Sequence, residues 1–232
     1  MKEFIFGSYI YNYELIKQTR RTMSLTVTPD LRIVLKCPEN TTKEKIDHFL
    51  QKKWFWLEKQ LSFFKKYQRK TYKREYISGE GFLYLGKQYK ITVQKNTKDS
   101  ISLSKTQLYI RTRKSVTNSL HNKKLLDLWI ASKTETVFQD RYIEMLKKFD
   151  YKNIPRLEIR NMKKRWGSFL NKDKIFLNPK LIHVSKDCID YVIIHELCHI
   201  KYKNHDKKFF NLLKDKYPKW KRVKDKLELF LI

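Results

Sequence analysis

The pattern of apolar and polar positions divides the chain into a β-rich first part and a more helical second part. In the first part, short apolar stretches alternate with turn residues, which is typical of strands joined by hairpins. One long stretch differs, because apolar side chains between Lys43 and Lys66 recur every three or four residues and predict an amphipathic helix. The predicted strands cover residues 10–16, 23–27, 31–35, 82–85, 89–93, 101–103 and 107–111.

Helical spacing dominates the second part. It predicts a long helix from Leu120 to Phe149, which Pro155 separates from a short strand at residues 157–159 and a hairpin at residues 166–178. A second helix, from about residue 188 to Tyr202, is apolar nearly all round and is therefore expected to be buried. We expect an α+β fold, with a β-rich N-terminal region containing one long helix over residues 1–118 and a second domain over residues 119–232. The basic run at residues 65–74 is interpreted as a connection, and no internal repeat is visible.

The net charge changes this picture most. The 232 residues include 52 Lys and Arg against 24 Asp and Glu, a formal charge of +28. Such a charge favours anionic partners, above all nucleic acid, because phosphate contacts need no particular base sequence. However, the basic residues are spread along the chain, and Lys, Ile, Asn and Tyr are all abundant, as in proteins from AT-rich genomes. The charge therefore permits both a nucleic-acid partner and a compositional origin.

The chain shows none of the sequence signals of secretion or membrane insertion. No stretch approaches the roughly 18 apolar residues of a membrane span, and the first residues lack the apolar core of a signal peptide. Three cysteines, Cys37, Cys188 and Cys198, are an odd number and do not suggest a disulfide framework. We expect a soluble cytoplasmic protein with reduced thiols and no membrane partner.

The segment His195-Glu196-Leu197-Cys198-His199 carries the most specific chemistry, an HExxH motif. With Asp187 as N-cap, a helix running to about Tyr202 places His195 and His199 one turn apart on the same face, where two imidazoles can converge on one Zn²⁺. Polar side chains in so apolar a helix are costly to bury unless something binds them, and a metal does so. Cys198 faces away from the two histidines and is predicted to be a small core residue.

A third ligand is available at His205, ten residues after His195. Asn204 can adopt the left-handed conformation that ends a helix, which would place His205 just beyond the helix end. Three neutral histidines leave one position on Zn²⁺ open for water, whose pKa the metal lowers. Glu196 is then the expected general base of a peptide hydrolysis through the zinc-bound water. The oxyanion needs a further donor, and the candidates are Tyr202 and Arg165, for which core packing and a surface charge are the respective alternatives.

These segments resemble the YgjP-like metallopeptidases, which are related to the SprT and Wss-type zincins. The resemblance covers about seventy residues, and it implies a minimal zincin core with an HExxH active-site helix, peptidase activity and a protein or peptide substrate. It also implies that substrate adds as a strand beside Ile175–Asn178, which makes Asn178 a possible substrate-binding residue. Phe169 departs from the pattern, because the family usually has a small residue or cysteine there. The matching residues are Trp166-Gly167-Ser168, Ile175–Asn178, Tyr191-Val192, His195–His199, Asn204-His205 and Phe209.

The leading prediction is therefore a zinc metalloendopeptidase. The alternative is a nucleic-acid-associated basic protein whose zinc is structural, or a protease that acts on DNA-bound proteins. Glu196 argues against a purely structural site, because such a site has no need of an unpaired carboxylate beside its ligands.

Overall fold

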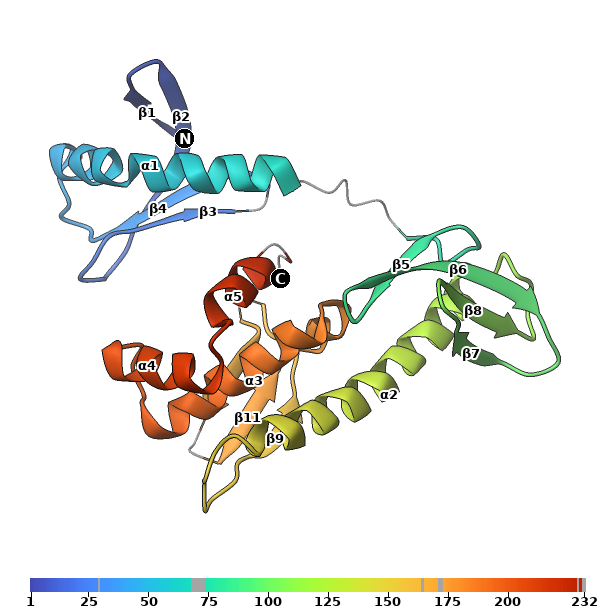
Figure 1. The fold of residues 1–232 in the computed structure, drawn as a ribbon. Coiled ribbons are helices and arrows are strands. Elements are labelled where there is room, and N and C mark those ends of the chain that lie inside the picture. The colour runs from blue at the N-terminus through green and yellow to red at the C-terminus, as the bar shows by residue number, and fades with distance from the viewer. Residues whose placement is uncertain (29, 68–73, 164, 171–172, 229, 231–232) are drawn as a thin grey trace. The chain divides into compact units, whose positions relative to one another are not determined.

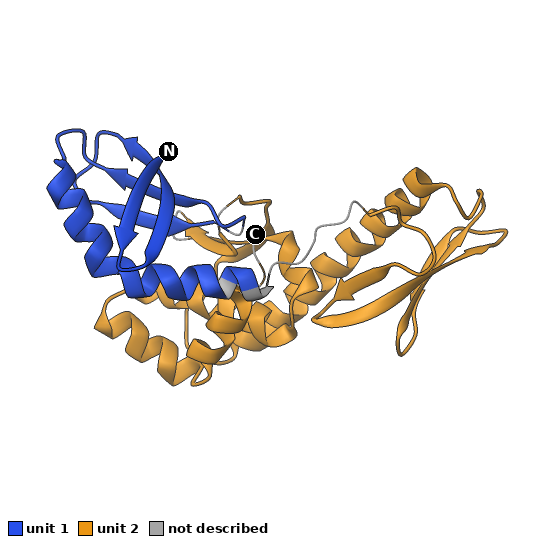
Figure 2. Cartoon of the chain, turned by 90° about the horizontal axis from the view of Figure 1, so that it is seen from above, with its two compact units in different colours: residues 1–72 blue, residues 73–232 orange. Residues whose placement is uncertain are grey.

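The computed structural model describes residues 1–28, 30–67, 74–163, 165–170, 173–228 and 230, and it confirms a mixed α+β protein. The chain forms two compact units, Met1–Tyr72 and Lys73–Ile232 (Figure 2). The connection predicted at residues 65–74 overlaps this division, and its residues 68–73 lie outside the described part. The division predicted after residue 118 falls inside the second unit, so that residues 73–118 group with the C-terminal part of the chain.

The first unit is a four-stranded sheet with one long helix. Its strands β1 (Lys2–Phe6), β2 (Tyr9–Lys17), β3 (Ser24–Val27) and β4 (Ile33–Cys37) lie in the order β1-β2-β4-β3. Helix α1 (Lys43–Tyr67) packs on the sheet, and its start agrees with the sequence prediction, whereas β1 was not predicted. The unit has a hydrophobic core of its own, which includes Leu35, Leu50 and Leu57.

The second unit begins with another four-stranded sheet followed by a long helix. Strands β5 (Gly81–Tyr84), β6 (Lys87–Lys95), β7 (Ser100–Leu103) and β8 (Gln107–Thr112) lie in the order β5-β6-β8-β7. Helix α2 (Ser119–Leu146) contacts β7 and β8, and Figure 1 shows this sheet at the N-terminal end of α2. The C-terminal end of α2 lies away from this sheet, beside the elements that follow it in the chain (Figure 1).

Strands β1–β4 of the first unit and strands β5–β8 of the second unit are arranged and paired in the same way. In both, the first two strands form an antiparallel hairpin with a two-residue turn, the second strand pairs in parallel with the fourth, and the third pairs antiparallel with the fourth. The register also agrees, because Ser24–Val27 pairs with Ile33–Lys36 as Ser100–Leu103 pairs with Leu108–Arg111. Residues 2–37 and 81–112 thus form an internal repeat of strand order and pairing, which the sequence did not reveal.

Equivalent positions of the repeat share burial and hydrogen bonding as well. Cys37 and Thr112 end the fourth strands and are both fully buried. Their carbonyls accept hydrogen bonds from Gln18 and Asn96, at 3.1 and 2.9 Å. The Cys37 thiol and the Thr112 side chain, which are similar in size, therefore occupy equivalent buried positions. The strand arrangement is the same at these positions although the residue type differs.

A three-stranded sheet follows α2. Strands β9 (Arg156–Ile159), β10 (Gly167–Leu170) and β11 (Lys174–Leu177) lie in the order β10-β11-β9, with β11 antiparallel to β10 and parallel to β9. The prediction that Ile175–Asn178 forms an exposed edge is wrong, because β11 lies between the other two strands. The edge strand that packs against the next helix is β10.

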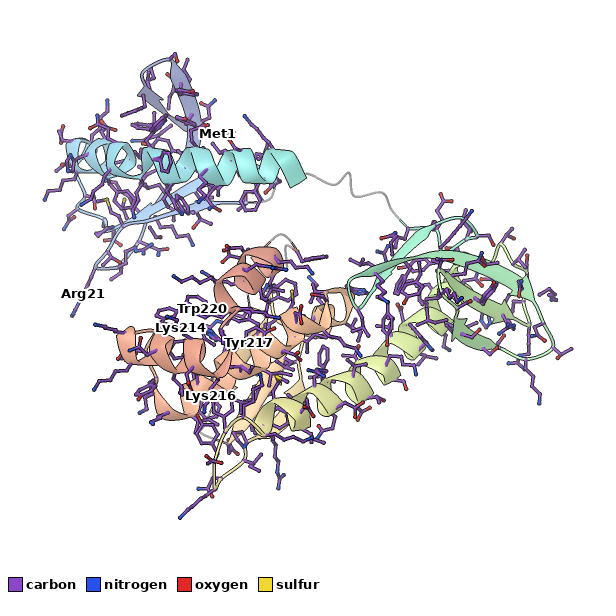
Figure 3. All side chains as sticks on the ribbon, viewed as in Figure 1. Met1, Arg21, Lys214, Lys216, Tyr217 and Trp220 are labelled. Atoms are coloured by element: carbon purple, nitrogen blue, oxygen red, sulfur yellow. The ribbon has the colours of Figure 1, made fainter. Side chains whose placement is uncertain are left out.

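The remaining elements are helical: the 3-10 turn η1 (Pro179–His183) and helices α3 (Lys186–Lys201), α4 (Lys207–Lys216) and α5 (Trp220–Glu228). The predicted burial of α3 is confirmed, since every side chain from Cys188 to Ile194 is buried. Neither α4 nor α5 was predicted from the sequence. Tyr217 and Trp220, labelled in Figure 3, mark the short connection between them.

Both ends of α3 differ from the sequence prediction. Ser185, not Asp187, is the N-cap residue, and Asp187 lies in the first turn, where its charge favours the helix N-terminus. At the other end Tyr202 leaves the helix in an extended conformation, with φ of −127° and ψ of 112°. Asn204 is not among the residues with positive φ, so the predicted left-handed ending is wrong.

Polar contacts fix α3 within the second unit. Arg141 of α2 donates two hydrogen bonds, of 2.6 and 2.7 Å, to the carboxylate of Asp190, which is only 6% exposed. At the helix start, the β5–β6 turn reaches η1, where Leu85 N–H donates to the Ile182 carbonyl at 2.9 Å. In the described part of the chain, no helix combines the length and apolarity that a membrane crossing requires.

Candidate metal centre

The structure brings the three predicted histidines together. His195 and His199 project from one face of α3, as their spacing predicts, and His205 lies in the loop between α3 and α4. One ring nitrogen from each of the three lies within 4.8 Å of the others. Three nitrogens at this separation can converge on one ion with bonds of about 2.0–2.1 Å after small side-chain adjustments.

Hydrogen bonding orients the rings. Nδ1 of His199 lies 3.0 Å from the Tyr202 carbonyl, so Nδ1–H donates there and Nε2 keeps a free lone pair for a metal. Nε2 of His195 and Nε2 of His205 face one another at 2.9 Å. Nδ1 of His195 is buried, and within the described part of the chain it has no hydrogen-bond partner.

Phe209, from α4, supports all three imidazoles. Its ring centroid lies 5.0 Å from that of His195, 4.7 Å from that of His199 and 4.7 Å from that of His205. The side chain is fully buried. Because it touches each histidine, Phe209 limits the rotamers available to the whole cluster.

The surroundings of His195 and His205 favour the neutral imidazole, which is the form that binds metal. Burial, with smaller contributions from the neighbouring His199 and His205, lowers the pKa of His195 to about 3. Burial and the nearby His199 also lower the pKa of His205, which is more exposed. Three imidazole nitrogen donors suit Zn²⁺, so the residues present fit the metal that the sequence predicts.

Glu196 lies beside this cluster on α3 and is only 6% exposed. Burial is the main reason that the pKa of its carboxyl is raised to about 8, and the nearby Phe169 backbone N–H and the charge of Arg165 partly offset this effect. A buried carboxyl beside a cluster of three histidines is a candidate general base.

The histidines and Glu196 open onto a cavity of about 970 Å³. Its walls come from the start of β10, the exposed face of α3, the loop after α3 and the end of α5. The lining residues are Asn153, Arg165, Trp166, Gly167, Ser168, Phe169, Tyr191, Val192, His195, Glu196, His199, Ile200, Lys203, His205 and Leu227. Leu227 could not have been found from the sequence, because α5 was not predicted.

Of the three further candidates, Arg165 lines the cavity and the other two do not. Tyr202 contributes its backbone carbonyl to His199, while its ring packs against the hydrophobic core. Asn178 is fully buried: its side-chain amide donates to the carbonyls of Met162 and Arg165, and its side-chain oxygen accepts from Lys180 N–H. With its hydrogen-bonding groups used inside the protein, Asn178 is not placed to bind substrate.

A buried helix that presents two histidines and a glutamate to an open cavity, with a third histidine beyond its end, defines a metal-binding protein of the metallopeptidase class. The chain belongs to the YgjP-like family, whose metallopeptidase domain matches residues 21–229.

Two solved structures show a limited similarity to the chain. The metallopeptidase zymogen of Pyrococcus abyssi abylysin is 21% identical, covers 39% of this chain and 90% of its own, and has a TM-score of 0.36. The metallopeptidase zymogen of Methanocaldococcus jannaschii jannalysin is 29% identical, covers 41% of this chain and 90% of its own, and has a TM-score of 0.38. No curated protein matches the chain.

Proposed function

We propose that the protein is a zinc-dependent metalloendopeptidase with a minimal zincin core, in which His195, His199 and His205 hold the metal. The observation that carries the proposal is the placement of Glu196, a buried carboxyl that faces the same cavity as the three histidines. A structural metal site has no use for such a carboxyl or for an open cavity beside its ligands.

The metal and the protein divide the chemistry between them. When bound, Zn²⁺ lowers the pKa of water and polarises a carbonyl group. Glu196 accepts the proton of the attacking water and then delivers it to the amine that leaves. Arg165 lines the cavity and is the candidate donor to the carbonyl oxygen as negative charge develops there. Tyr202 is a weaker candidate, because its ring packs in the core.

The substrate is a protein or peptide bound along β10. Asn178 N–H donates to the Trp166 carbonyl at 2.8 Å, so Trp166 and Asn178 form a hydrogen-bonded pair of the antiparallel ladder. Such pairs alternate, so the backbone groups of Gly167 and Phe169 point away from β11, toward the open edge. An extended peptide could use the N–H and carbonyl of Gly167 and the carbonyl of Phe169 there, which gives affinity with little dependence on sequence.

The alternative of a nucleic-acid-associated protein with a structural zinc rests on the net charge of +28. The same charge would suit a protease that acts on DNA-bound proteins. DNA binding that weakens steeply with salt would support a nucleic-acid partner, whereas no binding at low salt would remove it.

The test is a comparison of the zinc-loaded wild type with Glu196→Gln. The glutamine keeps the size of the side chain but cannot accept a proton, so zinc should stay bound while casein hydrolysis falls by about 10²-fold or more. Zinc content by elemental analysis and casein hydrolysis should be measured on the same samples. Equal activity of the two proteins would contradict the proposed role of Glu196, and an inactive wild type with zinc bound would argue against the peptidase.

A further inference from the structure

Gly167, the first residue of β10, lies in contact with Glu196. A β-carbon at Gly167 would lie 2.7 Å from Glu196 Oε1, 2.9 Å from Glu196 Cγ and 2.7 Å from Val192 Cγ1. These distances are shorter than ordinary van der Waals contacts, so any other residue would displace one of these side chains. The backbone of Gly167 does not have a positive φ. Space, not backbone conformation, is therefore the reason for glycine here.

The same strand also brings a backbone donor toward Glu196. The N–H of Phe169 faces the open side of β10, by the alternation of the ladder, and it lies close enough to the Glu196 carboxyl to lower the pKa of that group. Gly167 and Phe169 lie two residues apart and share this side of the strand. Gly167 leaves room for the Glu196 carboxyl because it has no side chain, and Phe169 offers a backbone N–H to the same carboxyl.

Asn178 fixes the start of β10. Its side-chain amide donates to the Met162 carbonyl at 2.8 Å and the Arg165 carbonyl at 2.9 Å, and its backbone N–H donates to the Trp166 carbonyl. These three bonds hold the chain that leads into Gly167. Because Asn178 is fully buried, they are shielded from water.

We infer that Gly167 and the Phe169 N–H form a cradle that positions the Glu196 carboxyl, and that Asn178 holds this cradle in place. The inference rests on the proposed function for its catalytic consequence, because it concerns the orientation of the general base. Gly167, Phe169 and Asn178 are positioning residues: they act through Glu196 and take no part in proton transfer.

The first experiment uses the full chain with Gly167→Ala and, as a matched control, Gly81→Ala. Gly81 also begins a strand of the second unit, but a β-carbon there meets the flexible end of the Gln88 side chain. In Gly167→Ala the displaced carboxyl should lower kcat by about 10- to 100-fold, with KM within about twofold and zinc content unchanged. Gly81→Ala should keep the wild-type kcat. An unchanged kcat in Gly167→Ala, or an equal loss in the control, would overturn the inference.

The second experiment isolates the Phe169 N–H and does not depend on Gly167→Ala folding. Phe169→Pro removes the N–H at a position that makes no hydrogen bond to β11, where an edge strand tolerates proline. Phe169→Ala removes the ring and keeps the N–H. We expect kcat to be at least tenfold lower in Phe169→Pro than in Phe169→Ala, at similar KM and zinc content. Equal kcat values would show that the N–H has no positioning role.

A third measurement separates failure of the cradle from failure of the proposed function. The Phe169 amide lies on an open strand edge, so its protection from hydrogen exchange depends on Glu196 accepting its hydrogen bond. In the zinc-free and zinc-loaded proteins, this protection should be lost in Gly167→Ala and in Glu196→Ala. If the wild type hydrolyses no peptide but shows this pattern, the peptidase proposal fails and the cradle stands. If protection is unchanged in both variants, the cradle itself is refuted.

Discussion

Replacing Phe209 tests how the metal ligands are held. Phe209→Ala removes a fully buried ring that lies against all three histidines. Truncation of a buried Phe costs about 3–5 kcal/mol of unfolding free energy, because contacts are lost and a cavity remains. In a unit of this size each 1 kcal/mol shifts Tm by about 2–4 °C, so we expect the Tm of the second unit to fall by about 10 °C. Zinc affinity should also fall, by about tenfold, because the imidazoles gain freedom.

The assay compares three variants in the zinc-free and zinc-loaded states. Thermal unfolding followed by circular dichroism gives the stability, and competition with a chelator gives the zinc affinity. Phe209→Leu keeps most of the volume and should cost less than about 1.5 kcal/mol. Phe210→Ala is the comparison: Phe210 is 36% exposed, stacks on Trp220 at 5.2 Å and lies near a single ligand, with its ring centroid 6.1 Å from that of His205, so its loss should lower zinc affinity less than Phe209→Ala does. Wild-type stability and zinc affinity in Phe209→Ala would refute the reasoning.

The remaining predictions concern charge, metal and packing. In the zinc-free protein the raised pKa of Glu196, about 8 against an ordinary 4.5, means that its contribution to stability is complete below pH 4.5 and lost as the pH rises through about 8. The difference in unfolding free energy between Glu196→Gln and the wild type, measured in urea, should therefore shift in favour of the variant from pH 5 to about pH 9. The same difference at the two pH values would contradict this. His205→Ala should lower the zinc stoichiometry measured by elemental analysis, whereas the exposed His48→Ala should retain one zinc per chain; full stoichiometry in His205→Ala would exclude the third ligand. Asp190→Ala leaves the Arg141 charge without its partner and should cost about 3 kcal/mol in urea unfolding, and Arg141→Met combined with Asp190→Leu should recover most of it; a single variant as stable as the wild type would show that the pair contributes nothing.

The sequence predicts the elements whose signal is local. The spacing of His195 and His199 follows from the helical period alone, and the apolar run around them predicts the burial of α3. The start of α1 at Lys43 likewise agrees with its periodicity and the preceding turn residues. In each of these cases neighbouring residues along the chain carry all the information that the prediction uses.

Features that depend on strand order escape local patterns. An apolar strand such as Ile175–Leu177 does not reveal whether it lies at an edge or in the middle of a sheet, and β11 proves to be central. Asn178 follows that strand, so the role predicted for it depended on the same error. The cradle formed by Gly167 and Phe169 could not be predicted either, because it depends on the approach of β10 to α3.

The short C-terminal helices and the internal repeat were missed for different reasons. In α5, only Val223 and Leu227 are buried among many lysines, so the apolar stripe is short and the charged residues dominate the pattern. The repeat preserves register and burial while exchanging residue types, as at Cys37 and Thr112. Comparison of backbone pairing reveals it, whereas comparison of residues along the chain does not.

The central claim is that three histidines of this chain hold a zinc ion with a position open for water. X-ray absorption at the zinc edge of the loaded protein tests it most directly, because it reports the type, number and distance of the ligands. The account predicts three imidazole nitrogens at about 2.0–2.1 Å together with one oxygen. A sulfur ligand at about 2.3 Å, which would have to come from a cysteine, or fewer than three imidazoles, would contradict it.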